Sequence, residues 1–422
     1  MKHWTRHSSV RTAAVAGIAA LALLTAACAS KGSGGASSAG GGGGKGRIGI
    51  SLIVPTGTAL TNYPQVVAAA KAAIRAVNAA GGVHGEQLAL DYCNESNDAA
   101  KALACTRAAV ASGDVATIAL YSNNAQQAVL PYLGDLPNLA PEAISPAEVS
   151  CTQCYPLDAT PVATLAAEGP LGAMNGITDA TMVSYDIPAS QTAVAQLKPG
   201  FAAAHVAIKD DIAVPLTTSD WAPVAQRFKA SGAQAFIPVL PEQQTIAFLQ
   251  AAKQAGVTPR ILATDGQIEP SDLPTLGSAA EGALVVSPFP PASAASTMPG
   301  VNQWLTELKA EQATGDFGAA PAMADGNSMR AWLAVHVIAD IATKDITGTV
   351  NRASFAAALK TAKNVNLMGI LPNWTPSAAS PVATLAHLNN AYAYFTKVEN
   401  GQYVLINPQP WNVFKGGFNS AS

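Results

Sequence analysis

The chain has 422 residues, of which 49% are apolar and 12% are charged, a balance typical of folded globular domains and not of disordered chains. Its 24 basic and 27 acidic residues give a formal net charge of −3, and no stretch concentrates lysine and arginine, which argues against nucleic-acid binding. The length is sufficient for two domains.

The start of the chain has the organisation of an export signal. Basic residues open the sequence, and the apolar run 13–27 is too short to span a bilayer comfortably. The run ends in Leu-Thr-Ala-Ala before Cys28, which resembles the lipobox of bacterial lipoproteins, although the leucine stands four positions before the cysteine instead of three. The resemblance implies that 1–27 is a signal peptide and that Cys28 carries a lipid anchoring the protein at the outer face of the cell membrane. The alternative is an ordinary secretory signal cleaved after Ala-x-Ala, with Cys28 incidental.

Residues 28–46 are expected to form a flexible tether behind the lipidated cysteine. They are nearly all Gly, Ser and Ala, and such a segment cannot bury enough apolar surface to fold. The glycine run before Lys45 is superficially similar to a phosphate-binding loop. However, Gly46 follows the lysine where Ser or Thr is required, and the run precedes the first predicted strand instead of following one. We therefore reject a nucleotide site here.

Strand and helix patterns alternate from residue 47 onward. A β-rich run ends at Pro55, and the following apolar stripe at helical spacing ends at Gly81-Gly82, a helix C-cap. The predicted order is strand 47–54, helix 63–80, strand 87–93, helix 98–112, strand 116–121 and a helix from about 124. This rhythm predicts an α/β fold with a parallel sheet and helices on both of its faces.

A second alternating unit follows Pro161. Its predicted strands are 180–184, 205–213, 235–239, 261–264 and 282–287, with helices between them that include 222–231 and 243–255. The segment 300–361 is mostly helical. The sequence then closes with the runs 391–398 and 402–406 around Asn400-Gly401, a strong hairpin signal.

The order of these segments resembles the leucine/isoleucine/valine-binding proteins, which have the type I periplasmic-binding-protein fold and serve ABC importers. The resemblance covers 47–407, and its matching stretches are 72–85, Cys93-Asn94 with Asp98 and Cys105, 228–236, 264–266, 373–375 and 399–403. It implies two doubly wound α/β lobes joined by crossovers, with a small-molecule ligand in the cleft between them. It also implies a membrane permease and ATPase complex as partner. Lobe 1 would be 47–157 plus 288–364, lobe 2 would be 158–287 plus 365–407, and 408–422 would be a C-terminal tail.

Four cysteines remain if Cys28 is lipidated, and an even set outside the cytosol indicates disulfides. Cys93 ends a predicted strand and Cys105 lies in the next helix, a distance that a disulfide can bridge. Cys151 and Cys154 could instead form a redox motif, but no helix follows them that would lower a thiol pKa. We expect both pairs, Cys93–Cys105 and Cys151–Cys154, to be structural.

Ligands of open α/β sheets bind beyond the carboxyl ends of the strands, so the strand-end loops are the candidate site. In lobe 1 these loops supply Thr58, Ser122 with Asn123, and Ala143 with Ser145. The resemblance implies that Ser122, Ala143 and Ser145 hold a ligand carboxylate. The alternatives are an ordinary loop at Thr58, a helix cap at Ser122 and Asn123, and a proline-rich turn around Ser145.

In lobe 2 the strand-end candidates are Tyr185, Leu240 and Asp265. Tyr185 would close over an apolar ligand or pack in the core, and Leu240 would line the floor of the cleft. At the place of Asp265 the resembling family carries an acidic residue that holds an α-ammonium group, whereas an Asp-Gly pair can also serve as a simple turn. An amino acid or a related small organic solute is the expected ligand.

Enzymatic activity is not expected, because no HExxH motif, no GxSxG motif in the folded region and no cluster of metal ligands occurs in the sequence. No metal and no cofactor are therefore predicted. The alternative function is a ligand-sensing receptor module without a role in transport.

Overall fold

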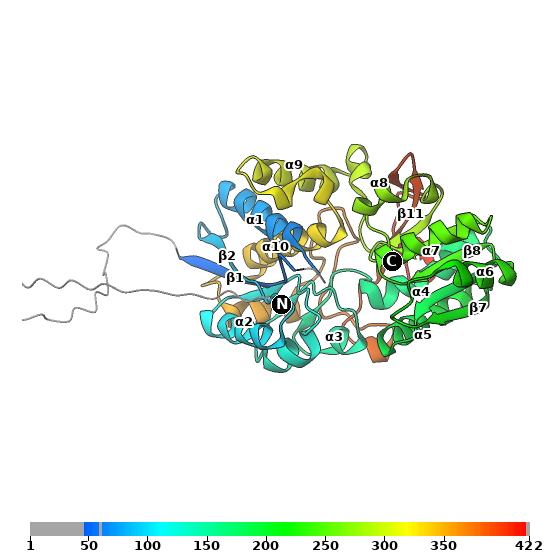
Figure 1. The fold of residues 1–422 in the computed structure, drawn as a ribbon. Coiled ribbons are helices and arrows are strands. Elements are labelled where there is room, and N and C mark those ends of the chain that lie inside the picture. Colours follow the sequence, from blue (N-terminus) through cyan, green and yellow to red (C-terminus); the bar gives the residue numbers. More distant parts are fainter. Residues whose placement is uncertain (1–45, 59–60, 419–422) are drawn as a thin grey trace, which may run out of the picture. The chain divides into compact units, whose positions relative to one another are not determined.

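The computed structural model describes residues 46–58 and 61–418 (Figure 1). The predicted signal peptide, the lipidation site Cys28 and all but the last residue of the tether lie outside these ranges. Within them, no helix is long and apolar enough to cross a membrane.

The first half of the chain builds a five-stranded parallel sheet in the order β2-β1-β3-β4-β5. Its strands are β1 (Arg47–Ile53), β2 (Gln87–Cys93), β3 (Ala116–Ile118), β4 (Asn138–Leu139) and β5 (Cys154–Tyr155). The helices that belong to this lobe are α1 (Pro64–Ala79), α2 (Ala99–Ser112), α3 (Pro146–Ser150), α9 (Pro299–Gln312), α10 (Gly326–Asp345) and α11 (Arg352–Thr361). This sheet and its helices are called lobe 1 below.

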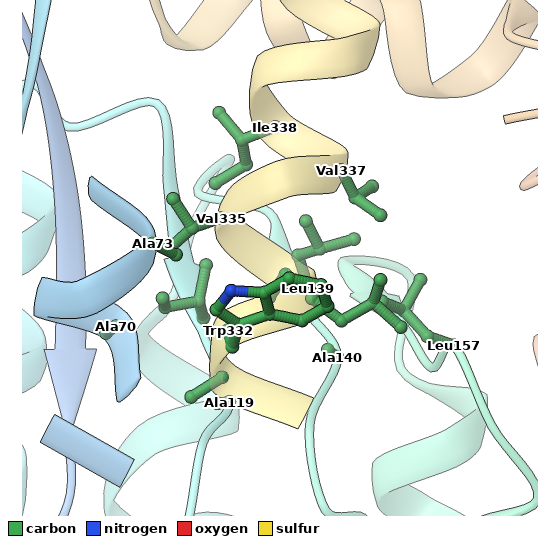
Figure 2. Close-up of a cluster of buried hydrophobic side chains, with 14 of the residues drawn as sticks. Ala70, Ala73, Ala119, Leu139, Ala140, Leu157, Trp332, Val335, Val337 and Ile338 are labelled. Atoms are coloured by element: carbon green, nitrogen blue, oxygen red, sulfur yellow. The ribbon is translucent and has the colours of Figure 1, made fainter. Parts of the chain in front are cut away.

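The centre of lobe 1 is the contact between α1 and α10 (Figure 2). Small side chains such as Ala70 and Ala73 on α1 let α10 approach closely, and Trp332 of α10 fills the space in front of Ala119 and Ala140. The Trp332 side chain is fully buried, and its indole N–H donates to Glu307 at 2.6 Å, so its one polar group is satisfied. The sequence forms this core because α10 is apolar over most of its circumference.

The second sheet has nine strands, of which β6 to β10 run parallel and the last four add antiparallel. They are β6 (Asp179–Tyr185), β7 (Ala207–Val214), β8 (Ala235–Val239), β9 (Arg260–Thr264), β10 (Leu284–Ser287), β11 (Tyr392–Glu399), β12 (Gln402–Leu405), β13 (Trp411–Asn412) and β14 (Gly417–Phe418). Its helices are α4 (Thr160–Met174), α5 (Pro188–Ala203), α6 (Ala222–Ser231), α7 (Glu242–Gln254) and the short α8 (Leu273–Leu276). This unit is called lobe 2.

The chain passes between the two lobes after β5, after β10 and after α11. A hydrogen bond joins the first passage to the third: the side-chain amide of Asn390, after α11, donates to the carbonyl oxygen of Leu157, after β5, at 2.8 Å. The expected two-lobed α/β architecture is therefore confirmed.

Helices α4 and α5 touch backbone to backbone. A Cβ added to Gly169 would lie 2.5 Å from the Gly200 carbonyl oxygen, and one added to Gly200 would lie 1.8 Å from the Ala166 carbonyl oxygen. Both helices contain an interior proline, Pro170 and Pro199. Prolines normally interrupt helices, which explains why the sequence pattern gave no bounds for these two.

The structure confirms several local predictions and differs from others. Asn400 and Gly401 have φ of 53° and 70° and join β11 to β12 in the predicted hairpin. The structure contains both expected disulfides, Cys93–Cys105 and Cys151–Cys154. The segment 408–422, expected as a tail, contains β13 and β14, which extend the second sheet. The helix expected from about 124 is one π-helical turn, Ala125–Val129, followed by a 3₁₀ turn.

Candidate ligand-binding site

A cavity of about 1010 Å³ opens where the strands of lobe 2 end. Residues that directly follow β8, β9 and β10 line it, namely 240–241, 265–267 and 288–290. The start of α10 and the preceding segment 321–325 contribute the side that belongs to lobe 1. The position is the one that parallel sheets favour for ligands.

A second, small cavity of about 130 Å³ adjoins it on the side of lobe 1. It is lined by Thr61, Tyr63, Leu120, Ser122, Asn123, Glu142, Ala143, Ile144 and Glu148. Glu142 and Ile144 line both cavities, so the loop 140–145 separates them. Ala140 and Ala143 in this loop have positive φ values of 55° and 40°, a conformation that costs free energy for a residue with a Cβ. The surrounding fold therefore holds this loop in a defined shape.

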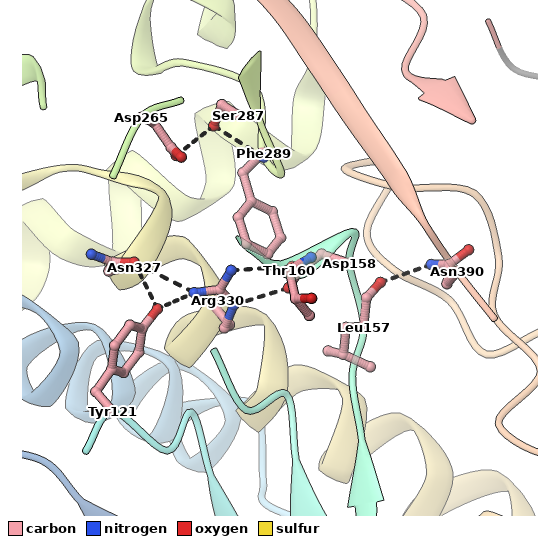
Figure 3. Close-up of polar contacts among 10 residues, drawn as sticks. All are labelled: Tyr121, Leu157, Asp158, Thr160, Asp265, Ser287, Phe289, Asn327, Arg330 and Asn390. Atoms are coloured by element: carbon pink, nitrogen blue, oxygen red, sulfur yellow. Dashed lines mark hydrogen bonds and ion pairs between the residues drawn. The ribbon is translucent and has the colours of Figure 1, made fainter. Parts of the chain in front are cut away.

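Asp265 and Leu240, two of the three residues predicted for lobe 2, line the large cavity. Asp265 follows β9 directly, and its carboxylate accepts a hydrogen bond from the Ser287 hydroxyl at 2.7 Å (Figure 3). Burial, partly opposed by this hydrogen bond and by the charge of Arg330, raises the pKa of Asp265 to about 6. The carboxyl group is thus accessible from the cavity and poorly solvated.

Ser122, Asn123 and Ala143, predicted for lobe 1, line the small cavity. The Ser122 hydroxyl oxygen accepts from the backbone N–H of Asn124 at 3.1 Å, which is a local turn bond and not a helix cap, since Asn124 is itself the N-cap of the turn 125–129 and has no side-chain cap bond. The Asn123 amide donates to Asn97 at 3.3 Å. These side chains can still face a solute, but part of their hydrogen-bonding capacity is already used.

Three predicted residues, Ser145, Thr58 and Tyr185, line neither cavity. Local hydrogen bonds or packing in the core explain the position of each. Ser145 precedes α3 and its hydroxyl donates to Glu148 at 2.8 Å. The Thr58 hydroxyl donates to the Thr61 carbonyl oxygen within its own loop and accepts from the side-chain amide of Asn97 in the loop after β2. Tyr185 packs in the hydrophobic core on the face of β6, as the alternative reading allowed, because the cavity lies beyond the strand end and not against that face.

Sequence reasoning missed the most connected charge of the site, Arg330 on α10 (Figure 3). Its guanidinium is 1% exposed and donates to both carboxylate oxygens of Asp158, at 2.9 and 3.1 Å. It also donates to the Tyr121 hydroxyl and lies between the rings of Tyr121 and Phe289. A lone charged residue in the otherwise uncharged first half of α10 was the available signal.

Sequence reasoning also missed the acidic character of the large cavity. Glu142, Glu269 and Asp325 line it together with Asp265. Burial, with further contributions from neighbouring carboxylates, raises the pKa of Glu142 to about 7 and that of Glu269 to about 8. Asp325 caps α10, accepting from the Ser328 backbone N–H at 2.7 Å and from the Gln65 side chain at 2.8 Å. Perturbed carboxyl groups that converge on one cavity are typical of a functional site.

No group of three or more His, Cys, Asp or Glu side chains in 46–58 and 61–418 is arranged to hold a metal ion. The large cavity combines charged and apolar walls.

A sequence profile of the periplasmic binding protein family matches residues 47–402. This chain belongs to that family. This periplasmic binding protein is 31% identical over 131 residues to Leu/Ile/Val-binding protein homolog 6 of Brucella suis. That match covers 30% of this chain and 32% of the relative, so it spans about a third of the relative's length.

Solved structures show the same two-lobed type I fold along nearly the whole binding protein. A solute-binding protein of an ABC transporter from Rhodopseudomonas palustris HaA2, in complex with p-hydroxybenzoic acid, superposes with a TM-score of 0.68 at 20% identity. The match covers 87% of this chain and 97% of the Rhodopseudomonas chain. A leucine-binding protein from Thermotoga maritima superposes with a TM-score of 0.65 at 17% identity. That match covers 85% of this chain and 98% of the Thermotoga chain. Both are described as binding proteins, one of leucine and one in complex with an aromatic acid, so their ligands differ in class.

Proposed function

We propose that the protein is the extracytoplasmic receptor of an ABC importer and captures a small organic solute in the large cavity. The observation that carries the proposal is a cavity of about 1010 Å³ at the strand ends of lobe 2, facing the start of α10. Family membership over 47–402 supports the same role. Lobe 1 is proposed to comprise 47–157 plus 288–364, and lobe 2 to comprise 158–287 plus 365–407. Closure of one lobe over the other would bury the solute.

Export and membrane attachment belong to the same proposal. A receptor of an importer must stand outside the membrane beside its permease, and a lipid on Cys28 with the tether 28–46 would hold it there. Metabolic labelling with a radioactive fatty acid should label the intact protein and not the Cys28→Ala variant. Equal labelling of both would contradict the anchor.

Within the site, we propose Asp265 as the counter-charge of an ammonium group on the solute, with Leu240 as an apolar contact. Ser122, Asn123 and Ala143 would contact the other end. Replacing Asp265 by Asn keeps the shape and removes the charge. A hydrogen bond to a charged group contributes about 1.5–3 kcal/mol, so the affinity for an amine-bearing solute should fall roughly ten- to hundred-fold.

The matched control is Asp186→Asn, since Asp186 also follows a strand of lobe 2 but is exposed and lines neither cavity. The solute would first be found by a thermal-shift screen of a metabolite panel, because binding to the folded state raises Tm. Calorimetry on the three proteins would then measure affinity. Equal affinity of the Asp265→Asn variant for an amine would contradict the role of Asp265. Unchanged uptake of the solute in a deletion strain would contradict transport and favour a sensor.

A further inference from the structure

The large cavity has an unbalanced set of charges. Four carboxyl side chains line it, and among its described lining residues Arg330 is the one with a basic side chain. The charge of Arg330 is compensated by Asp158, which holds it through two hydrogen bonds. Among the described residues, no ion pair joins the remaining carboxyl groups to a basic side chain, although the Arg330 charge partly offsets the effect of burial on the pKa of Glu142 and Asp265.

The described hydrogen-bond partners of these carboxyl groups are few, and none of them is charged. Asp265 accepts from the Ser287 hydroxyl, and Glu269 caps the turn that ends at Asp272. No hydrogen bond or ion pair from another described residue reaches the carboxyl group of Glu142, which lies at the junction of the two cavities. Buried carboxylates of this kind are stabilised only by an added positive charge or by a hydrogen-bond donor.

The small cavity is also ill suited to an acid. It is lined by Glu142 and Glu148, although the family resemblance placed a ligand carboxylate here. The hydroxyl of Ser145 donates to Glu148, and the oxygen of Ser122 accepts from Asn124. A solute carboxylate would face two acidic side chains with few free donors, and like charges in a poorly solvated site repel.

The backbone of the large cavity points the same way, independently of the charges. Eight prolines line it: Pro161, Pro241, Pro270, Pro274, Pro288, Pro290, Pro291 and Pro321. Proline has no backbone N–H but keeps its carbonyl oxygen. The wall therefore offers apolar surface and acceptors, and relatively few donors that an anion could use.

We propose, on the basis of the receptor function above, that the solute is an organic cation: an amine with an apolar body and no free carboxylate. Its ammonium group would lie among Glu142, Asp265 and Glu269. The apolar body would lie against the proline-rich wall and Leu240. A solute with two amino groups would use more of these carboxylates than a solute with one.

The test compares aliphatic and aromatic solutes with related carbon skeletons that differ in charge. Calorimetry at pH 7.5 would use 3-methylbutylamine, leucine and 4-methylpentanoate, then phenethylamine and benzoate, and finally 1,5-diaminopentane. We expect the amines to bind, the diamine at least ten-fold more tightly than the monoamine of similar length, and the acids not to bind. If leucine or an acid binds more tightly than its matched amine, the inference fails and the receptor function stands. If no compound of a broad solute panel binds the folded protein, the receptor function fails as well.

Variants identify the recognising groups. Glu142→Gln and Glu269→Gln keep the side-chain size and remove one charge each, so each should weaken amine binding about ten-fold or more. Glu86→Gln is the matched control, because Glu86 lies in the turn before β2 and lines neither cavity. Amine affinity that is the same in all three variants as in the unaltered protein would overturn the assignment.

Discussion

Arg330 and Asp158 form a buried, two-pronged ion pair, with Nε–Oδ2 and Nη2–Oδ1 distances of 2.9 and 3.1 Å. Arg330 belongs to α10 of lobe 1, whereas Asp158 lies on the passage from β5 to α4 of lobe 2. The ring of Phe289, on the passage after β10, lies 5.3 Å from the guanidinium carbon. One side chain thus joins two of the passages between the lobes.

Breaking this pair should destabilise the protein strongly. Asp158→Asn leaves the Arg330 charge buried without compensation, and such a loss costs about 3–5 kcal/mol. Denaturant unfolding measures the change in the free energy of unfolding. The control is Asp210→Asn, which removes the exposed pair with Arg227 and should cost no more than about 1 kcal/mol. Equal losses in the two variants would contradict the structural role of the buried pair.

The cavity carboxyl groups predict how the stability of the empty protein depends on pH. Their folded-state pKa values are about 7 for Glu142, 6 for Asp265 and 8 for Glu269, all above the usual values of 4.5, 3.8 and 4.5. Between about pH 4 and pH 8 the unfolded chain releases these protons before the folded state does, so stability falls as the pH rises. Below about pH 4 these groups are protonated in both states, so the stability that is lost at higher pH is fully present there.

The measurement is Tm between pH 4 and pH 9, compared with a Glu142→Gln/Glu269→Gln double variant. Other groups titrate in both proteins, so the difference between the two curves isolates this effect. The variant should gain Tm relative to the unaltered protein as the pH rises from 5 to 8. A constant difference across that range would show that the two carboxyl groups are well solvated.

Glu168 should be replaceable by an apolar residue with a gain in stability. It is fully buried in α4, and neither carboxyl oxygen has a hydrogen-bond partner among the described residues. Burial raises the pKa of Glu168 well above its usual range, which favours the protonated form. Glu168→Met should raise the free energy of unfolding by about 1–3 kcal/mol, since an unsatisfied polar group is removed. A lower Tm for the variant would mean that the carboxyl group has a partner in solution.

The two disulfides should contribute unequally. Cys93–Cys105 closes a loop with a sequence separation of 12, and Cys151–Cys154 closes one of 3. In the chain-entropy treatment the longer loop contributes about 3 kcal/mol and the shorter about 2 kcal/mol. Double serine variants of each pair, unfolded under identical conditions, test the order. A larger loss for the Cys151–Cys154 variant would contradict it.

Much of the fold could be predicted because long strands and helices carry a clear period. The strands at 47–54 and 87–93 and the Asn400-Gly401 hairpin are examples. The two-residue strands β4 and β5 could not be predicted, since two residues contain no alternation. Their pairing depends on tertiary contacts in the parallel sheet.

The site was predictable only in outline. Strand ends drew attention to the loops that hold Leu240 and Asp265, and both residues line the large cavity. No local pattern, however, tells which side chain of a kinked loop faces a cavity, so Ser145 was chosen and Glu142 was not. The Arg330–Asp158 pair joins residues 172 positions apart, and such a contact has no signature in a single sequence.

The close contact of α4 and α5 at Gly169 and Gly200 affects the wall of the large cavity. Thr164 and Leu165 on α4, and Ala189 and Ser190 on α5, all line the large cavity. The spacing of these two wall segments is set by Gly169 and Gly200, where no side chain stands between the helices. A single methyl group at either glycine would push the helices apart and widen the wall. In the proposed receptor, the size of the accepted solute would therefore be adjustable from two positions that line neither cavity.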